Sequence, residues 1–158
     1  MSDSSPTEVG IYGVGHFGYA LLRHLARKGD AGLRLRGFDQ NDEVRATLGG
    51  QRRHPYYEYD PEHPLGAEVR IVDGPDAFFD GLEIFILAVT SHSTREVVEY
   101  FAKGDRPIPP AIVSTAKALD SDTGRTLGEV IDEVLEPTGR AYSLAAFSGG
   151  TIATDMLR

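Results

Sequence analysis

Apolar and polar residues follow two periodicities along this chain, and these predict strands and helices in regular succession. Short runs that are apolar throughout or at every second position predict strands at residues 9–12, 33–38, 69–72, 83–89, 111–114 and 141–147. Spacings of three and four predict helices at residues 19–28, 41–48, 75–80, 93–102 and 123–136, with another starting at 151. Strands that alternate with helices are typical of a parallel sheet covered on both faces. We therefore predict a doubly wound, mostly parallel α/β fold with three αβα layers, forming a single domain over residues 1–158.

Two connecting segments carry further signals. Ser93 and Glu96 have the spacing of a capping box, which predicts that the helix at 93–102 starts there. Residues 49–66 contain three prolines and no periodicity, so we predict a loop. Three tyrosines of this loop either cover a bound ligand or are ordinary surface aromatics: Tyr56, Tyr57 and Tyr59.

A glycine-rich turn, GVGHFG at residues 13–18, joins the first predicted strand to the first predicted helix. In such a turn Gly13 permits the tight bend, Gly15 lets a pyrophosphate approach the main chain, and Gly18 lets the helix pack closely. The start of a helix also offers N–H groups and a partial positive charge to phosphates. A plain structural turn is the alternative, but the strand–turn–helix context favours a dinucleotide site and a Rossmann-type fold.

Asp39 ends the second predicted strand, where a carboxylate can accept hydrogen bonds from the adenosine ribose and repel a 2′-phosphate. This favours NAD over NADP. The alternative is that Asp39 caps the helix at 41–48. Arg34 and Arg36 lie nearby in sequence and are candidates to accommodate a 2′-phosphate. Phe38 either packs on adenine or belongs to the core.

Lys117 directly follows the predicted strand at 111–114. Ligands of open parallel sheets bind outside the carboxyl ends of the strands, so this position places an ammonium group at the ligand-binding edge. There it can bind a substrate oxyanion or phosphate as a point charge. A solvated loop lysine is the alternative.

The segment FSGGTIA at residues 147–153 is a second strand–glycine–helix junction. Its main-chain N–H groups and the Thr151 hydroxyl suit an anion or a cofactor amide. A glycine turn with Thr151 as the helix cap is the alternative.

Acidic residues outnumber basic ones by 24 to 16, which gives a net charge of −8 at pH 7. No Lys/Arg-rich stripe offsets this charge, so we expect no binding to nucleic acid or to anionic membranes. The chain contains no cysteine, which excludes disulfides, thiolate metal sites and cysteine nucleophiles.

No apolar run reaches the roughly 18 residues that a membrane helix requires. The polar, acidic segment at 1–8 differs from signal and transit peptides, so we expect a cytoplasmic protein. The five histidines form no tight ligand pair, and we expect no metal site. The nearest approach to one is a loop group of His54, Asp60, Glu62 and His63.

Taken together, these stretches resemble the N-terminal domain of NAD-dependent glycerol-3-phosphate dehydrogenase. The resemblance rests on GVGHFGYALLRHL, FILAVTSHSTREVV, IVSTAKALDSDTGRTLGEVI and SGGTIATD. The family's fold is a dinucleotide-binding domain followed by a separate helical substrate domain. Three positions depart from the family's pattern: Phe17 for tryptophan, and Thr90 and Gly150 for proline.

The resemblance implies a role for ten residues. The residues of the pyrophosphate turn would be Gly13, Gly15, His16, Phe17 and Gly18. The other contacts to NAD would be Phe38, Lys117 and Ala153, and the substrate contacts would be Lys117, Gly149 and Thr151. Lys117 would be the catalytic residue, because it would stabilise the substrate's oxygens by charge.

The implied reaction is hydride transfer between NAD and C2 of glycerol 3-phosphate or dihydroxyacetone phosphate. The family's acid/base lysine and phosphate-binding arginine belong to the second domain, so we expect this chain to be inactive alone. A homodimer or a separate substrate-domain chain would complete such an enzyme. A non-catalytic dinucleotide-binding or sensing module is the alternative.

Overall fold

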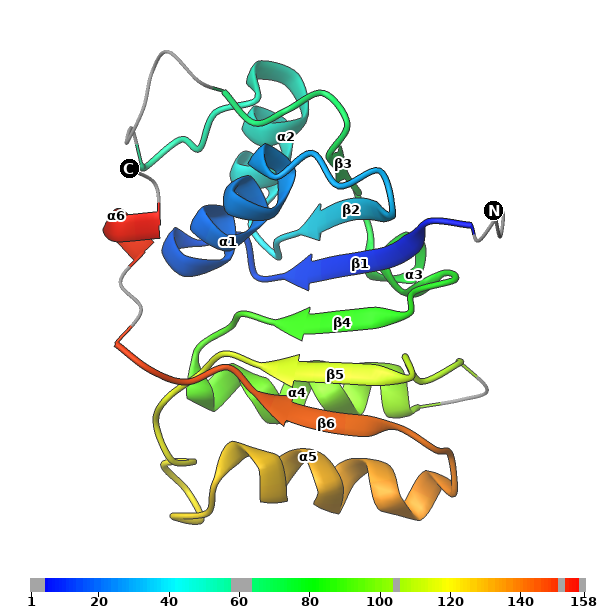
Figure 1. Cartoon of the computed structure of the whole chain (residues 1–158). Coiled ribbons are helices and arrows are strands. Elements are labelled where there is room, and N and C mark those ends of the chain that lie inside the picture. The colour runs from blue at the N-terminus through cyan, green and yellow to red at the C-terminus, as the bar shows by residue number, and fades with distance from the viewer. Residues whose placement is uncertain (1–4, 58–63, 104–105, 151–152, 157–158) are drawn as a thin grey trace.

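The computed structural model describes residues 5–57, 64–103, 106–150 and 153–156. It contains one parallel sheet of six strands, in the order β3-β2-β1-β4-β5-β6 (Figure 1). The strands are β1 (Thr7–Tyr12), β2 (Leu33–Phe38), β3 (Arg70–Ile71), β4 (Ile84–Leu87), β5 (Ala111–Ser114) and β6 (Ser143–Ala146). The helices are α1 (His16–Arg27), α2 (Asp42–Gln51), α3 (Pro75–Phe79), α4 (Ser91–Ala102), α5 (Leu127–Leu135) and α6 (Ala153–Met156), and a 3-10 helix spans Glu136–Thr138.

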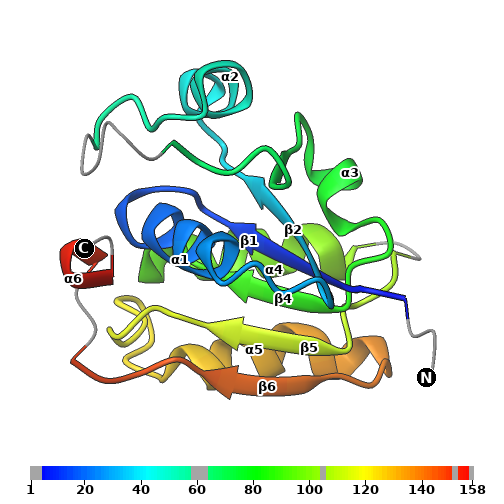
Figure 2. The same ribbon diagram turned by 45° about the horizontal axis from the view of Figure 1, so that its top comes forward.

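Helices cover both faces of the sheet, as Figures 1 and 2 show. One face packs against α1, α2 and α6, where Ile11 and Leu22 are fully buried. The other packs against α3, α4 and α5, where Phe85 and Phe101 are fully buried. Strands buried on both faces need apolar side chains at successive positions, which explains the continuous apolar run at β4. The predicted αβα, Rossmann-type fold is confirmed.

The strands end in register at one edge of the sheet. Across it, Phe38 pairs with Tyr12, Tyr12 with Leu87, Leu87 with Ser114, and Ser114 with Ala146. The residues that follow these five strand ends therefore come together at this carboxyl edge, on the left of Figure 1. From β1 the sheet is extended on one side by β2 and β3, and then on the other side by β4, β5 and β6, so the order of the strands reverses between β1 and β4. In open α/β sheets ligands bind at such a switch point.

The helix starts differ from those the sequence predicts. Helix α1 begins at His16, so Gly18 lies in its first turn rather than before it. Helix α4 begins at Ser91 after Thr90, with no side-chain cap, so the predicted Ser93–Glu96 capping box is wrong. Helix α5 begins only at Leu127, where a capping box is present.

That capping box joins Thr126 and Glu129, each of which accepts from the main-chain N–H of the other. Residues 120–124 form a turn ahead of α5, because the carboxylate of the buried Asp120 accepts from both the N–H and the hydroxyl of Thr123. Gly124 follows with φ +68°, a value that favours glycine. Helix α2 runs to Gln51, past two glycines that the sequence places in a loop.

Candidate dinucleotide-binding site

Gly13 makes the bend after β1 in a conformation that only glycine adopts easily. Its φ is +92°, and a Cβ built there would lie 2.6 Å from the main-chain oxygen of Ala88. Its N–H donates to the oxygen of Phe38 at 2.8 Å. The turn is thus held between the ends of β2 and β4.

Gly18 and Gly15 lie in opposite environments. A Cβ at Gly18 would lie 1.9 Å from the oxygen of Gly13, so glycine is required for α1 to begin against the turn. A Cβ at Gly15 would meet no atom of the described residues within 4 Å. Packing within the chain therefore explains Gly13 and Gly18 but leaves an open space beside Gly15.

Gly15 is also the N-cap of α1. Among the described residues no side chain caps this helix, and its first turn contains no acidic residue. A helix start without a carboxylate or hydroxyl cap keeps its positive end available to an anion. A diphosphate fits this corner, because the absent Cβ lets the anion approach main-chain N–H groups.

The two glycine junctions meet at the carboxyl edge of the sheet. The ring of Phe17, in the first turn of α1, lies 5.9 Å from that of Phe147, which follows β6. The ammonium group of Lys117 donates to the main-chain oxygen of Gly149 at 2.8 Å. The structure therefore brings Lys117 and Gly149 together beside the turn. Thr151 lies outside the described residues.

A pocket of about 460 Å³ adjoins Lys117 on the side of α5. Leu119, Leu127 and Leu144 give it mostly apolar walls, and Ser148 also lines it. Ser114 also borders it, and its buried hydroxyl has no hydrogen-bond partner in the described part of the chain. The pocket can take a small molecule that presents an oxygen to the lysine.

Asp39 follows β2 and does not cap α2, so that alternative is wrong. The cap is Asn41, whose side-chain oxygen accepts from the N–H of Glu43 at 2.9 Å. The carboxylate of Asp39 instead accepts from the N–H of Asn41 at 2.9 Å. This short turn places a half-buried carboxylate at the carboxyl edge.

Arg34 and Arg36, the candidates to accommodate a 2′-phosphate, both pair with Glu8 and do not lie at this corner. Arg36 is buried, forms an ion pair with Glu8, and donates to the main-chain oxygens of Phe78 and Asp80. Arg34 lies 3.6 Å from the same Glu8 carboxylate. The Arg36 guanidinium is thus held between β1 and the α3 segment, and the largely exposed Arg34 lies beside the same glutamate.

Phe38 and Ala153 are both buried. The Phe38 ring packs 4.9 Å from that of Tyr12, and the guanidinium of Arg45 lies over it at 5.2 Å. Its core role is confirmed, and a contact with adenine stays a prediction. Ala153 packs into the core beside α1. Its contact with NAD stays a prediction.

His54 is the site residue that the sequence did not reveal. Its side chain is buried, and its Nε2 lies 2.9 Å from the oxygen of Val14, inside the glycine turn. The next residues bring Tyr57 onto His16, with the two rings stacked 4.7 Å apart. His16 and His54 thus both lie at the turn, whereas the sequence analysis considered His54 only as a possible metal ligand of the loop. A histidine in an aperiodic loop carries no signal of burial in the sequence.

Burial lowers the pKa of His54 below its ordinary value, outweighing the opposite effect of its bond to Val14. Of the three loop tyrosines, Tyr57 contacts the turn, whereas Tyr56 is largely exposed and donates to Glu43. Tyr59 lies outside the described residues.

No group of three or more histidine and acidic side chains that could hold a metal occurs among the described residues. Asp60, Glu62 and His63 fall outside them. None of the described helices has the length and apolar character needed to cross a bilayer.

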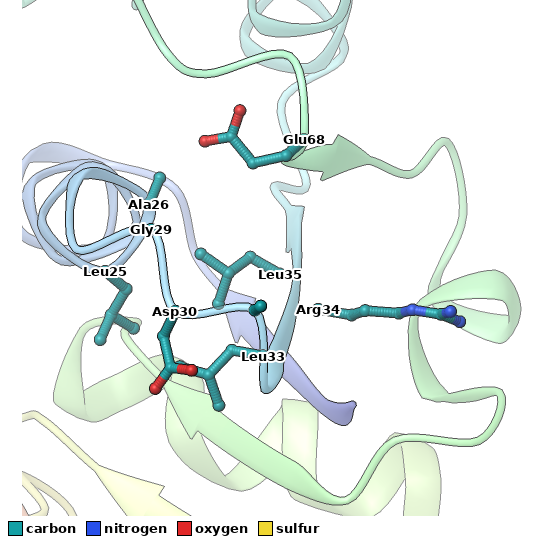
Figure 3. A pocket seen from close by; sticks show the side chains of 9 residues that line it. Leu25, Ala26, Gly29, Asp30, Leu33, Arg34, Leu35 and Glu68 are labelled. Atoms are coloured by element: carbon teal, nitrogen blue, oxygen red, sulfur yellow. The ribbon is translucent and has the colours of Figure 1, made fainter. Parts of the chain in front are cut away.

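A further cavity, of about 310 Å³, opens at the opposite edge of the sheet (Figure 3). Leu25 and Gly29, at the end of α1, border it together with Leu35, and Glu68 faces it from the other side. It lies at the far end of α1 from Gly15, so it is not part of the dinucleotide corner.

A family model described as the N-terminus of NAD-dependent glycerol-3-phosphate dehydrogenase matches residues 8–158. The glycerol-3-phosphate dehydrogenase (NAD(P)+) of Myxococcus xanthus is 31% identical over 150 residues, which cover 94% of this chain and 42% of that protein. The Chlamydia felis enzyme of the same name is 28% identical over 152 residues, covering 96% and 43%. The chain thus spans about two fifths of the length of these curated relatives.

Solved structures share the fold. The glycerol-3-phosphate dehydrogenase of Coxiella burnetii superposes with a TM-score of 0.76 at 21% identity, over 96% of this chain and 43% of that one. The Plasmodium falciparum enzyme gives 0.79 at 15% identity, over 97% and 43%. The match to an NAD-dependent family also confirms NAD as the predicted cofactor. Over residues 8–158 the chain belongs to the family of the N-terminal domain of NAD-dependent glycerol-3-phosphate dehydrogenase.

Proposed function

We propose that this chain binds NAD with the diphosphate resting on the turn at residues 13–18 and on the start of α1. The open space beside Gly15 carries this proposal, because atoms of the chain itself occupy the corresponding space beside Gly13 and Gly18. Main-chain N–H groups at a helix start and the positive helix end suit a doubly charged linkage. Because the chain as a whole carries a net charge of −8, an anion has to be held by local groups such as main-chain dipoles.

We further propose that the adenosine ribose lies against Asp39. Its carboxylate accepts hydroxyl hydrogen bonds and repels a 2′-phosphate, so NAD binds more tightly than NADP. The pairing of Arg34 and Arg36 with Glu8 supports this preference, because neither guanidinium faces Asp39. The guanidinium beside Asp39 belongs to Arg45, which forms an ion pair with Asp42.

For the reaction, we propose hydride transfer involving glycerol 3-phosphate or dihydroxyacetone phosphate, the chemistry that NAD supplies when bound. Lys117 would hold an oxygen of this substrate by charge while its bond to Gly149 keeps the ammonium group at the sheet edge. The adjoining pocket supports a small substrate at this position.

A proton donor or acceptor for the substrate hydroxyl is part of this proposal but is assigned to no residue here. We propose that a second domain supplies it, joined to this chain, contributed by a dimer partner or carried by a separate chain. The chain alone would then bind NAD without turnover.

Calorimetric titration of the 158-residue chain with NAD, followed by an assay with glycerol 3-phosphate, tests both parts. We expect one NAD per chain and no turnover. Lack of NAD binding contradicts the cofactor proposal, and turnover by the isolated chain contradicts the need for a second domain.

A further inference from the structure

Both ring nitrogens of His54 are hydrogen-bonded, one within the segment after α2 and the other to the main chain of the glycine turn. The N–H of Tyr56 donates to Nδ1 at 3.1 Å, and Nε2 lies 2.9 Å from the oxygen of Val14. A main-chain N–H can only donate, so Nδ1 must accept. The proton therefore lies on Nε2, which donates to Val14, and the ring is neutral in a single tautomer.

The surroundings of His54 keep this geometry fixed. The residue is 3% exposed, and its ring lies 5.3 Å from that of Tyr19 and 4.5 Å from that of Tyr57. The titratable groups whose charge acts on it are Asp39 and His16. Tyr57 in turn stacks on His16, the first residue of α1, with an angle of 19° between the rings.

We propose that His54 is a positioning residue for the dinucleotide. By donating to Val14 it fixes residues 54–57 against the turn, so that Tyr57 and His16 form a rigid wall of the diphosphate site. This inference rests on the proposed binding of NAD. The role belongs to the Nε2–Val14 hydrogen bond, because the Nδ1–Tyr56 bond is internal to the loop and cannot hold it on the turn.

Two substitutions separate the bonds. In His54→Gln, the side-chain amide can reach the Nε2 position and donate to Val14. In His54→Asn, the shorter side chain reaches only the Nδ1 position and can accept from Tyr56. Both remove the imidazole, so both lose packing.

We expect His54→Gln to bind NAD within about threefold of the wild-type chain and His54→Asn to bind about tenfold more weakly, the order expected for one buried hydrogen bond. Tyr57→Ala, which removes the wall itself, should weaken NAD by a similar factor. Tyr56→Ala is the matched control, since it keeps the main-chain donor and removes an exposed ring. It should bind as the wild type does.

Calorimetry gives these affinities, and nitrogen-15 NMR of the free wild-type chain gives the tautomer of His54, expected to carry its proton on Nε2. Three results would each overturn the inference: equal NAD affinities of His54→Gln and His54→Asn, an unchanged affinity of Tyr57→Ala, or a proton on Nδ1. The proposed function would still stand if the wild-type chain binds NAD. A wild-type chain that binds no NAD contradicts both.

Discussion

The ammonium group of Lys117 and the main-chain oxygen of Gly149 are joined by a hydrogen bond of 2.8 Å, although 32 residues separate them in sequence. The bond connects the loop after β5 to the loop after β6. A lysine that follows a buried strand thereby gains a fixed position at the edge where the strands end. Its ammonium group can donate three hydrogen bonds, so holding Gly149 does not preclude binding a ligand oxygen.

Lys117→Ala should weaken NAD binding only modestly, by about two- to fivefold, because one exposed hydrogen bond to the protein is lost. In the proposed function, the main role of the Lys117 side chain is to bind an oxygen of the substrate, which is absent from this titration. Calorimetry with NAD measures the effect, and Lys28→Ala, at the far end of α1, is the control for loss of a lysine. A loss of a hundredfold or more would show that Lys117 is principally a cofactor residue.

Asp39→Asn should shift the preference from NAD towards NADP by about tenfold, since the charge that repels a 2′-phosphate disappears. The asparagine oxygen can still accept from the N–H of Asn41, so the turn is kept. Asp30→Asn is the matched control and should leave the preference unchanged. The Asp30 carboxylate accepts from the N–H of Gly32 at 2.8 Å in the same type of turn, but at the other edge of the sheet. An unchanged ratio of the two dissociation constants in Asp39→Asn argues against the ribose role.

Gly18→Ala should lower the free energy of unfolding by about 2 kcal/mol or more, because its Cβ would overlap the oxygen of Gly13. Urea denaturation measures the loss. Gly50→Ala, in the exposed part of α2 with open space around it, should instead be neutral or stabilise by about 0.5–1 kcal/mol. Equal stability of the two variants would mean that α1 does not pack on the turn as described.

The stability of the chain should fall on mild acidification because of His54. Its pKa is lowered in the folded chain, so the unfolded chain takes up the proton first, near pH 6.5. The stabilisation is complete above that pH and is lost as the pH falls towards the folded pKa, at up to about 1.4 kcal/mol per pH unit. Urea denaturation at several pH values from 7.5 downwards checks this. His54→Gln should remove that part of the slope, and identical slopes would contradict the assignment.

Much of the fold could be predicted because local pattern and tertiary structure agree. The apolar run at β4, the alternation at β2 and the positive φ of Gly13 can each be read from a few neighbouring residues. Gly18 is fixed by the oxygen of Gly13, five residues earlier. The helix starts were less accessible. Ser93 and Glu96 fit a capping box, yet the chain already enters α4 at Ser91 directly after the end of β4.

The site was predictable where it depends on strand ends and not where it depends on long-range pairing. Lys117 and Asp39 follow strands, so the sheet places them at the carboxyl edge. Arg36 is drawn away by Glu8 and by main-chain oxygens more than 40 residues distant, which no local pattern records. His54 likewise acquires its role through Val14, 40 residues earlier.

The central claim is that the turn holds a diphosphate where Gly15 leaves space, and Gly15→Val tests it most directly by calorimetric titration with NAD. A Cβ at this position meets no described atom within 4 Å, so we expect the variant to fold while NAD binding falls at least about a hundredfold. Gly74→Val is the matched control, because Gly74 is also an extended N-cap glycine in open space and should leave NAD affinity unchanged. Equal NAD affinities of the wild type and Gly15→Val would contradict the account.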